Sequence, residues 1–256
     1  VLSELGARLY VIGDDPDGFN INDGYGATDT RTLQAAVIER QADLGIALDG
    51  DGDRLIMVDH RGAVVNGDKL ILIMALARAR AGKLQGGVVG TVMSNLGMEQ
   101  ALRANNIDFQ RAAVGDRYVL DRMKSNGWQL GGEASGHIIC LDKSTTGDGI
   151  VAALEVLQVI FESGKSIAEL AAEMETCPQL MINVEIPKGF DINGNGRIKE
   201  AVAAAEADLG SNGRIVLRPS GTEPLIRVMI EGVDAGQVKS QCEALAEIVR
   251  QAAAAN

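Results

Sequence analysis

The sequence predicts an α/β protein in which consecutive mixed-sheet α/β domains are followed by a small C-terminal α+β domain. The chain has 256 residues, 46% of them hydrophobic, which is enough for several cores. Before Cys177–Pro178, most strand-like apolar runs are separated by helix-like segments, and beyond it strands and helices do not alternate strictly. We therefore expect three domains, at residues 1–62, 63–176 and 177–256.

The first of these domains is expected to contain a strand, a loop rich in glycine and aspartate, a helix and a second strand. Val1–Gly6 has the pattern of the last turns of a helix closed by glycine, and Arg8–Ile12 predicts a strand. A helix is expected over Thr30–Arg40 and a strand over Leu44–Leu48, a succession typical of a parallel sheet. Because the chain begins without methionine and within a helix pattern, we expect it to be a fragment of a longer protein.

A hairpin that turns at His60–Gly62 is expected to lead into the second domain. A helix should run from Asp68, its expected N-cap, to Gly82. Further strands are expected at 86–93, 109–114, 128–133 and 137–141, and further helices at 98–105, 118–126 and 149–162. Ser166 and Glu169 have the spacing of a capping box, which predicts one more helix.

The C-terminal domain is expected to combine three strands with two helices. The strands are predicted at 180–187, 213–219 and 224–232, and the helices at 198–209 and 234–253. The alanines of these helices reflect helix propensity rather than low complexity.

Composition excludes several classes of protein. The net charge of −11 and the lack of a basic run argue against a nucleic-acid-binding protein. The longest apolar run, Leu70–Ala77, is too short to span a bilayer, and no signal-peptide pattern opens the chain. Cys140, Cys177 and Cys242 show no metal-site spacing, so we expect buried free thiols and a cytoplasmic protein.

The segment ALDGDGDRLIM carries the clearest chemical signal. Asp49, Asp51 and Asp53 alternate with glycine after an apolar strand, so their side chains can converge on one side of the backbone. Three crowded carboxylates require a positive partner. Hard oxygen ligands suit Mg²⁺, and Arg54 is placed to bind an oxyanion beside the ion.

Other acidic-loop chemistries fit this segment less well. An EF-hand needs glycine and glutamate at its sixth and twelfth positions, where this chain has Arg54 and His60. A haloacid-dehalogenase-like phosphatase stays open, with Asp49 as the nucleophile, although Asp53 stands where Thr or Val is expected. The segment Asp191–Gly196 also imitates half an EF-hand, but we expect it to be a surface turn.

Two further loops carry groups that suit a phosphorylated sugar. The loop Gly131–His137 places Glu133, Ser135 and His137 among three glycines, a set that suits sugar hydroxyls or an amine. The loop Arg218–Pro224, followed by Arg227, offers hydroxyl, backbone and guanidinium donors to phosphate oxygens.

These three loops, in this order and spacing, resemble the α-D-phosphohexomutase family. The segments VGDRYV at 114–119 and LDKSTTGDGI at 141–150 resemble in particular the bacterial phosphoglucosamine mutases. The resemblance covers essentially the whole chain. It implies four domains around a central cleft, of which residues 1–62 are the C-terminal part of the second, and the next two ranges the third and the fourth.

The resemblance also implies roles for individual residues. Asp49, Asp51 and Asp53 correspond to the Mg²⁺ ligands, with Arg54 in support. The sugar contacts correspond to Glu133, Ser135, His137 and Arg117. The phosphate contacts correspond to Arg218, Ser220, Gly221, Thr222 and Arg227.

The implied reaction interconverts glucosamine 6-phosphate and glucosamine 1-phosphate through a phosphoserine and a hexosamine 1,6-bisphosphate. The family's nucleophilic serine lies in a Ser-His-Asn-Pro-like loop that this sequence lacks, so we expect the chain alone to be an inactive mutase. Phosphoglucomutase or phosphomannomutase activity is the main alternative, and a non-catalytic sugar-phosphate-binding module a more remote one. A homodimer is left open.

Overall fold

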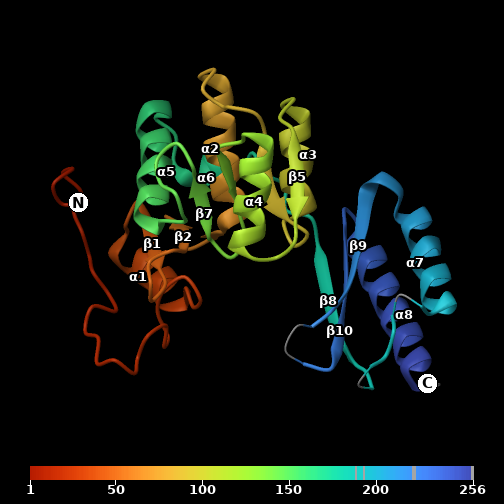
Figure 1. Ribbon diagram of the computed structural model, residues 1–256. Helices are drawn as coiled ribbons and strands as arrows, with labels where there is room; N and C mark the ends of the chain where they lie inside the picture. Colours follow the sequence, from red (N-terminus) through yellow and green to blue (C-terminus); the bar gives the residue numbers. More distant parts are fainter. Residues whose placement is uncertain (188, 193, 221–222, 255–256) are drawn as a thin grey trace. The chain divides into compact units, whose positions relative to one another are not determined.

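The computed structural model describes residues 1–187, 189–192, 194–220 and 223–254, which fold into two compact units (Figure 1). Unit 1 comprises Val1–Ser94 and Met98–Met174, and unit 2 comprises Asn95–Gly97 and Glu175–Asn256. Mixed α/β architecture is therefore confirmed, while the three-domain division stays a prediction. Within these ranges, no helix has both the length and the apolar character that a bilayer crossing requires.

Unit 1 begins with a small antiparallel sheet. Helix α1 (Arg31–Arg40) precedes strands β1 (Leu44–Leu48), β2 (Leu55–Asp59) and β3 (Val64–Val65), which lie in the order β1-β2-β3. The predicted hairpin at His60–Gly62 is confirmed, because β2 and β3 pair antiparallel around it.

Two expectations for the start of the chain are wrong. Val1–Gly6 forms turns rather than a helix, and Arg8–Ile12 is not a strand. Among the residues that the structure describes, β1 therefore pairs with the antiparallel β2 alone. The apolar side chains of the second segment are 38–64% exposed. A strand pattern produces a strand only where neighbouring backbone accepts its hydrogen bonds.

The larger sheet of unit 1 is mixed and has the order β5-β4-β6-β7. Strands β4–β5 and β4–β6 are parallel, and β6–β7 is antiparallel. Its strands are β4 (Val88–Thr91), β5 (Phe109–Ala112), β6 (Leu130–Gly132) and β7 (Ile138–Cys140). Its helices are α2 (Gly67–Arg80), α3 (Leu96–Ala104), α4 (Asp116–Asn126), α5 (Gly149–Ser163) and α6 (Ile167–Ala171).

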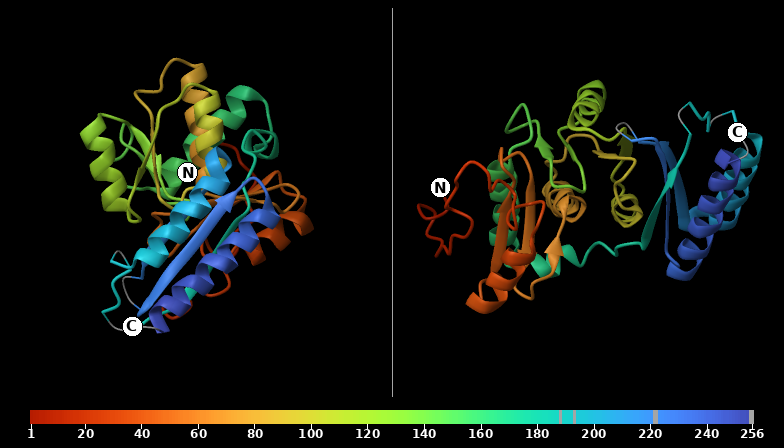
Figure 2. Two further views of the ribbon diagram at one scale, coloured as in Figure 1. Left: turned by 90° about the vertical axis from the view of Figure 1, so that its right-hand side faces the viewer. Right: turned by 90° about the horizontal axis from the view of Figure 1, so that it is seen from below.

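Helices cover both faces of this sheet (Figure 2). On β4, Val88 packs in a core with residues of α2, α3, α5 and α6, whereas its neighbour Val89 packs with Val119 and Met123 of α4. Successive strand residues point to opposite faces, so the two cores lie on opposite sides of the sheet. In open α/β sheets of this kind, ligands bind at loops that follow the carboxyl ends of the parallel strands.

The helix caps show how local sequence sets these boundaries. Helix α2 is capped by Asn66, whose side chain accepts a hydrogen bond from the Lys69 N–H at 3.2 Å, and not by Asp68 as expected. Asp68 instead lies in the first turn, where a carboxylate is favourable. The capping box of Ser166 and Glu169 at α6 is confirmed.

Unit 2 is an antiparallel sheet of order β8-β10-β9 with two helices packed on it. Its elements are β8 (Gln179–Glu185), α7 (Gly196–Leu209), a 3₁₀ turn (Gly210–Asn212), β9 (Gly213–Pro219), β10 (Leu225–Gly232) and α8 (Ala235–Ala254). Val228 and Ile230 of β10 are fully buried with Leu245 and Val249 of α8. All three cysteines are free and buried, as expected.

Candidate functional site

The acidic loop joins β1 to β2 in unit 1. One carboxylate oxygen from each of Asp49, Asp51 and Asp53 lies within 4.8 Å of the others. Asp49 Oδ1 accepts a hydrogen bond from the Arg54 backbone N–H at 3.1 Å, and the Arg54 Nε lies 3.4 Å from Asp49 Oδ2. The same Nε lies 4.0 Å from Asp53 Oδ1. The loop thus gathers three carboxylates and one guanidinium.

The electrostatics of this loop favour a cation. Burial raises the pKa of Asp53, and the charges of Asp49 and Asp51 act in the same direction, while His137 opposes them. One guanidinium cannot neutralise three carboxylates. Three converging oxygen ligands fit a hard divalent ion such as Mg²⁺, which keeps further positions for water or phosphate.

The loop between β6 and β7 meets the acidic loop directly. Arg54 and His137 form an antiparallel bridge, and the Leu55 N–H donates to the Gly136 carbonyl at 2.9 Å. His137 Nδ1 lies 2.9 Å from Asp53 Oδ2, and the imidazole is 6% exposed. Gly136 has φ +99°, and a Cβ there would lie 2.3 Å from the Leu55 carbonyl oxygen. Only glycine suits this close approach.

The other candidate sugar contacts are Glu133 and Ser135 in this loop and Arg117 on α4. Glu133 Oε1 accepts a hydrogen bond from the Gly115 N–H at 2.9 Å, which ties this loop to the start of α4. Ser135 is exposed. The Arg117 side chain is 86% exposed and lies 3.9 Å from Asp121 on its own helix. Glu133 and His137 are therefore each held by a hydrogen bond to a neighbouring loop, whereas Ser135 and Arg117 lie at the surface.

Unit 2 carries the predicted phosphate-binding residues on its β9–β10 hairpin. Arg218 and Arg227 stand directly opposite each other in the antiparallel register, and Ser220 follows β9. The Nε atoms of both arginines and the Ser220 Oγ are buried and lack a hydrogen-bond partner within the described ranges. Two cations opposite each other repel, so this arrangement suits an anion. Gly221 and Thr222 lie outside the described residues.

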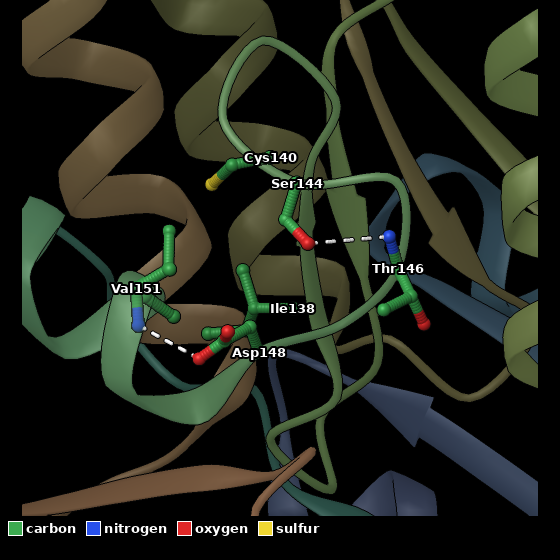
Figure 3. A pocket seen from close by; sticks show the side chains of 7 residues that line it. Ile138, Cys140, Ser144, Thr146, Asp148 and Val151 are labelled. Carbon is green, nitrogen blue, oxygen red and sulfur yellow. Dashed lines mark hydrogen bonds between the residues drawn. The ribbon is translucent and has the colours of Figure 1, made fainter.

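A fourth segment at the site lies within residues 141–150, to which the sequence analysis assigned no functional residue. Asp148 caps α5 by accepting hydrogen bonds from Ile150 and Val151, and Figure 3 shows the latter bond beside a small pocket. The next residue, Gly149, donates its N–H to the Gly52 carbonyl of the acidic loop at 2.9 Å. The sequence signal was present, because Asp148 is an N-cap residue flanked by two glycines.

Two family models match the chain. The model for phosphoglucomutase/phosphomannomutase alpha/beta/alpha domain III matches residues 66–177. The model for the phosphoglucomutase/phosphomannomutase C-terminal domain matches residues 181–248. Together they account for most of the chain.

Curated relatives and solved structures agree with these matches. The chain is 55% identical over 256 residues to the phosphoglucosamine mutase of Thiobacillus denitrificans and 56% identical over 252 residues to that of Methylococcus capsulatus. These alignments cover 100% and 98% of the chain but 56% of each relative, so the chain spans little more than half their length.

Among solved structures, the N-acetylphosphoglucosamine mutase of Aspergillus fumigatus, in complex with GlcNAc-6P and magnesium, superposes with a TM-score of 0.73. Its sequence identity is 20%, and the match covers 91% of this chain and 54% of that one. The likeness shows the fold.

Proposed function

Since the chain belongs to the phosphoglucomutase/phosphomannomutase family, we propose that it supplies the metal-, sugar- and phosphate-binding part of a phosphoglucosamine mutase. The observation that carries this proposal is the meeting of the acidic loop with the Glu133–His137 loop, where Asp53 and His137 are in direct contact. The identity to phosphoglucosamine mutases along the whole chain supports glucosamine phosphate as the substrate.

The acidic loop is proposed to hold Mg²⁺ through Asp49, Asp51 and Asp53. The three carboxylates fit the ion because their oxygens converge and are undercompensated by Arg54 alone. When bound, Mg²⁺ neutralises negative charge on a transferring phosphoryl group. The structural neighbour from Aspergillus fumigatus, which contains magnesium, supports the choice of metal.

The chain's own residues are proposed to bind and orient the sugar phosphate. Glu133 keeps one carboxylate oxygen on Gly115 and offers the other to a sugar hydroxyl or amine. Ser135 and Arg117 are proposed as further sugar contacts from their exposed positions. Arg218, Ser220 and Arg227 would donate to the phosphate that does not react, and Gly221 and Thr222 are proposed to join them.

The phosphoryl donor of this proposal is the family's phosphoserine, which no loop of this sequence supplies. The proposed role of the chain is therefore substrate and metal binding, and we expect no mutase turnover from it alone. We also expect the protein to act in the cytoplasm on a small phosphorylated sugar and its 1,6-bisphosphate.

Titration of the isotope-labelled chain tests this function. With Mg²⁺ present, D-glucosamine 6-phosphate should shift the amide resonances of the Glu133–His137 loop and of Arg218 and Ser220. Glucose 6-phosphate and mannose 6-phosphate, run in parallel, test the phosphoglucomutase/phosphomannomutase alternative, which the family models also name. Tighter binding of either would replace glucosamine in the proposal.

A second measurement separates the mutase family from phosphatase chemistry. The chain is incubated with acetyl phosphate and Mg²⁺, and intact-mass spectrometry follows. We expect no covalent adduct, because Asp49 is proposed as a metal ligand and not as a nucleophile. A phosphoryl group trapped on Asp49 would contradict the proposed function.

A further inference from the structure

Gly147 lies against the imidazole of His137. A Cβ at this position would lie 2.3 Å from His137 Nε2, 2.6 Å from Cε1 and 2.9 Å from Cδ2. Gly147 is buried and its φ is outside the left-handed region. A side chain at position 147 would therefore meet the His137 ring first, and backbone strain would not oppose it.

The opposite side of the same ring meets the acidic loop. His137 Nδ1 lies 2.9 Å from Asp53 Oδ2, with the N–H donating to the carboxylate. Nε2 is buried and has no hydrogen-bond partner among the described residues. The orientation of the ring is therefore set by Asp53 on one side and by the contact surface of Gly147 on the other.

The segment that carries Gly147 is itself held in place. The Lys143 and Ser144 N–H groups donate to the Cys140 carbonyl, and the Thr146 N–H donates to Ser144 Oγ at 3.4 Å (Figure 3). On the other side of Gly147, Asp148 caps α5 and Gly149 donates to Gly52. The segment 144–149 thus contacts the acidic loop both directly and through His137.

We propose that Gly147 is a positioning residue of the metal site: its bare Cα lets the His137 ring sit where Nδ1 orients the Asp53 carboxylate. This inference rests on the proposed function, because it requires Asp53 to be a metal ligand. Partners that hydrogen-bond to metal ligands fix the ligand's orientation, and their loss weakens metal binding by about 10–100-fold. A methyl group at position 147 displaces the ring and removes that hydrogen bond.

A double-mutant cycle with Mn²⁺ as the probe tests this inference, with the free ion measured by electron paramagnetic resonance. Gly147→Ala should weaken Mn²⁺ binding about tenfold, and His137→Ala should do the same. The double variant should bind no more weakly than His137→Ala, because without the ring the methyl group displaces nothing. The double variant also lacks the clash between the methyl group and the ring. It can therefore still be measured if Gly147→Ala alone folds poorly.

Gly196→Ala is the matched control, because a Cβ at that position would meet nothing within 4 Å. It should leave Mn²⁺ binding unchanged. In the metal-free chain, the ring resonances of His137 should shift in Gly147→Ala and not in Gly196→Ala.

The outcomes separate this inference from the proposed function. Mn²⁺ binding that Gly147→Ala leaves intact would overturn the positioning role alone. Additive losses in the double variant would also overturn it, because they would show that the methyl group acts by a route other than the ring. Failure of the wild-type chain to bind Mn²⁺ would overturn the metal site and this inference together.

Discussion

Both units concentrate like charge, but within the described ranges only the cluster of unit 1 is contacted by side chains that can balance part of it. In the acidic loop, Arg54 approaches Asp49 and His137 contacts Asp53. In unit 2, Arg218 and Arg227 face each other with buried Nε atoms that have no partner within the described ranges. The acidic loop is therefore held in part by neighbouring side chains before a cation binds, whereas within the described ranges the arginine pair has no carboxylate against it and depends on an anion.

The largest effect is expected from Asp51→Asn. Removing one charged oxygen from three should weaken Mg²⁺ binding by about 3 kcal/mol, or roughly 100-fold. The fold should survive, because Asp51 is exposed and its loss relieves repulsion in the metal-free loop. Competition with Mn²⁺ measures the affinity, and urea unfolding measures the stability.

Asp43→Asn is the control for that variant, since Asp43 is an exposed carboxylate just before β1 and outside the acidic loop. It should leave the metal affinity unchanged. Equal Mg²⁺ affinity in the Asp51 and Asp43 variants would mean that the acidic loop does not bind the metal. The proposed difference between a cation site in unit 1 and an anion site in unit 2 would then be wrong.

The next effect is expected from Arg218→Met. Loss of charge-assisted hydrogen bonds should weaken binding of inorganic phosphate by about 2 kcal/mol, or roughly 30-fold. The free energy of unfolding of the ligand-free chain should stay constant or increase, because Arg227 loses a like charge opposite it. Nuclear magnetic resonance titration and urea unfolding give the two quantities.

Arg197→Met controls for the loss of a positive charge on unit 2. Arg197 is exposed on α7 and donates to Gln251. It should change neither phosphate binding nor its salt dependence. A destabilised Arg218→Met chain would show that the arginine pair has internal partners after all, and would remove the difference between the two units.

A smaller effect is expected from Asp59→Asn at the end of β2. Burial alone would raise the pKa of Asp59, but hydrogen bonds from the Ala63 and Arg61 N–H groups and the Arg61 guanidinium lower it below 3.8. A lowered pKa contributes stability above pH 4 that is lost as the pH falls through the folded-state value. The variant should lose about 1.5 kcal/mol at pH 7.

The pH dependence provides the check on Asp59. The stability difference between wild type and Asp59→Asn, measured by urea unfolding, should shrink between pH 5 and pH 2. A difference that stays constant over this range would mean that the carboxylate charge is not what holds the β2–β3 turn. Phosphate binding at Arg218 should be the same in both proteins at pH 7, since that site lies in the other unit.

Local sequence predicted most elements because their signals are local. The capping box at Ser166, the hairpin at His60–Gly62 and the helix over Thr30–Arg40 each depend on residues a few positions apart. The failures had a different cause. Arg8–Ile12 has a strand pattern, but a strand also needs a neighbour, and no local pattern provides one.

The site divides in the same way. The carboxylate spacing of Asp49, Asp51 and Asp53 already indicated that these side chains converge. The contact of His137 with Asp53 joins positions 84 residues apart, and the fit of Gly147 against that ring depends on a loop from a third place in the chain. Such contacts follow from the packing of loops at one edge of two sheets, so they became visible only in the structure.

The smallest effect compares the two units through matched helix caps. Helices α2 and α7 each have 14 residues, and each is capped by an asparagine that accepts a backbone N–H at 3.2 Å. Asn66→Ala and Asn195→Ala should each lower the free energy of unfolding by about 1 kcal/mol.

The melting temperatures of the two variants should differ more than their free energies of unfolding, because unit 2 is about half the size of unit 1. A given loss lowers the melting temperature of a domain of 60–100 residues by about 4–8 °C but that of a domain of 150–250 residues by about 2–4 °C. Calorimetry should therefore show the larger shift for Asn195→Ala, in a transition that Asn66→Ala leaves in place. Equal shifts of a single transition would show that the two units unfold together. The difference in binding between the units would then not be accompanied by a difference in their stabilities.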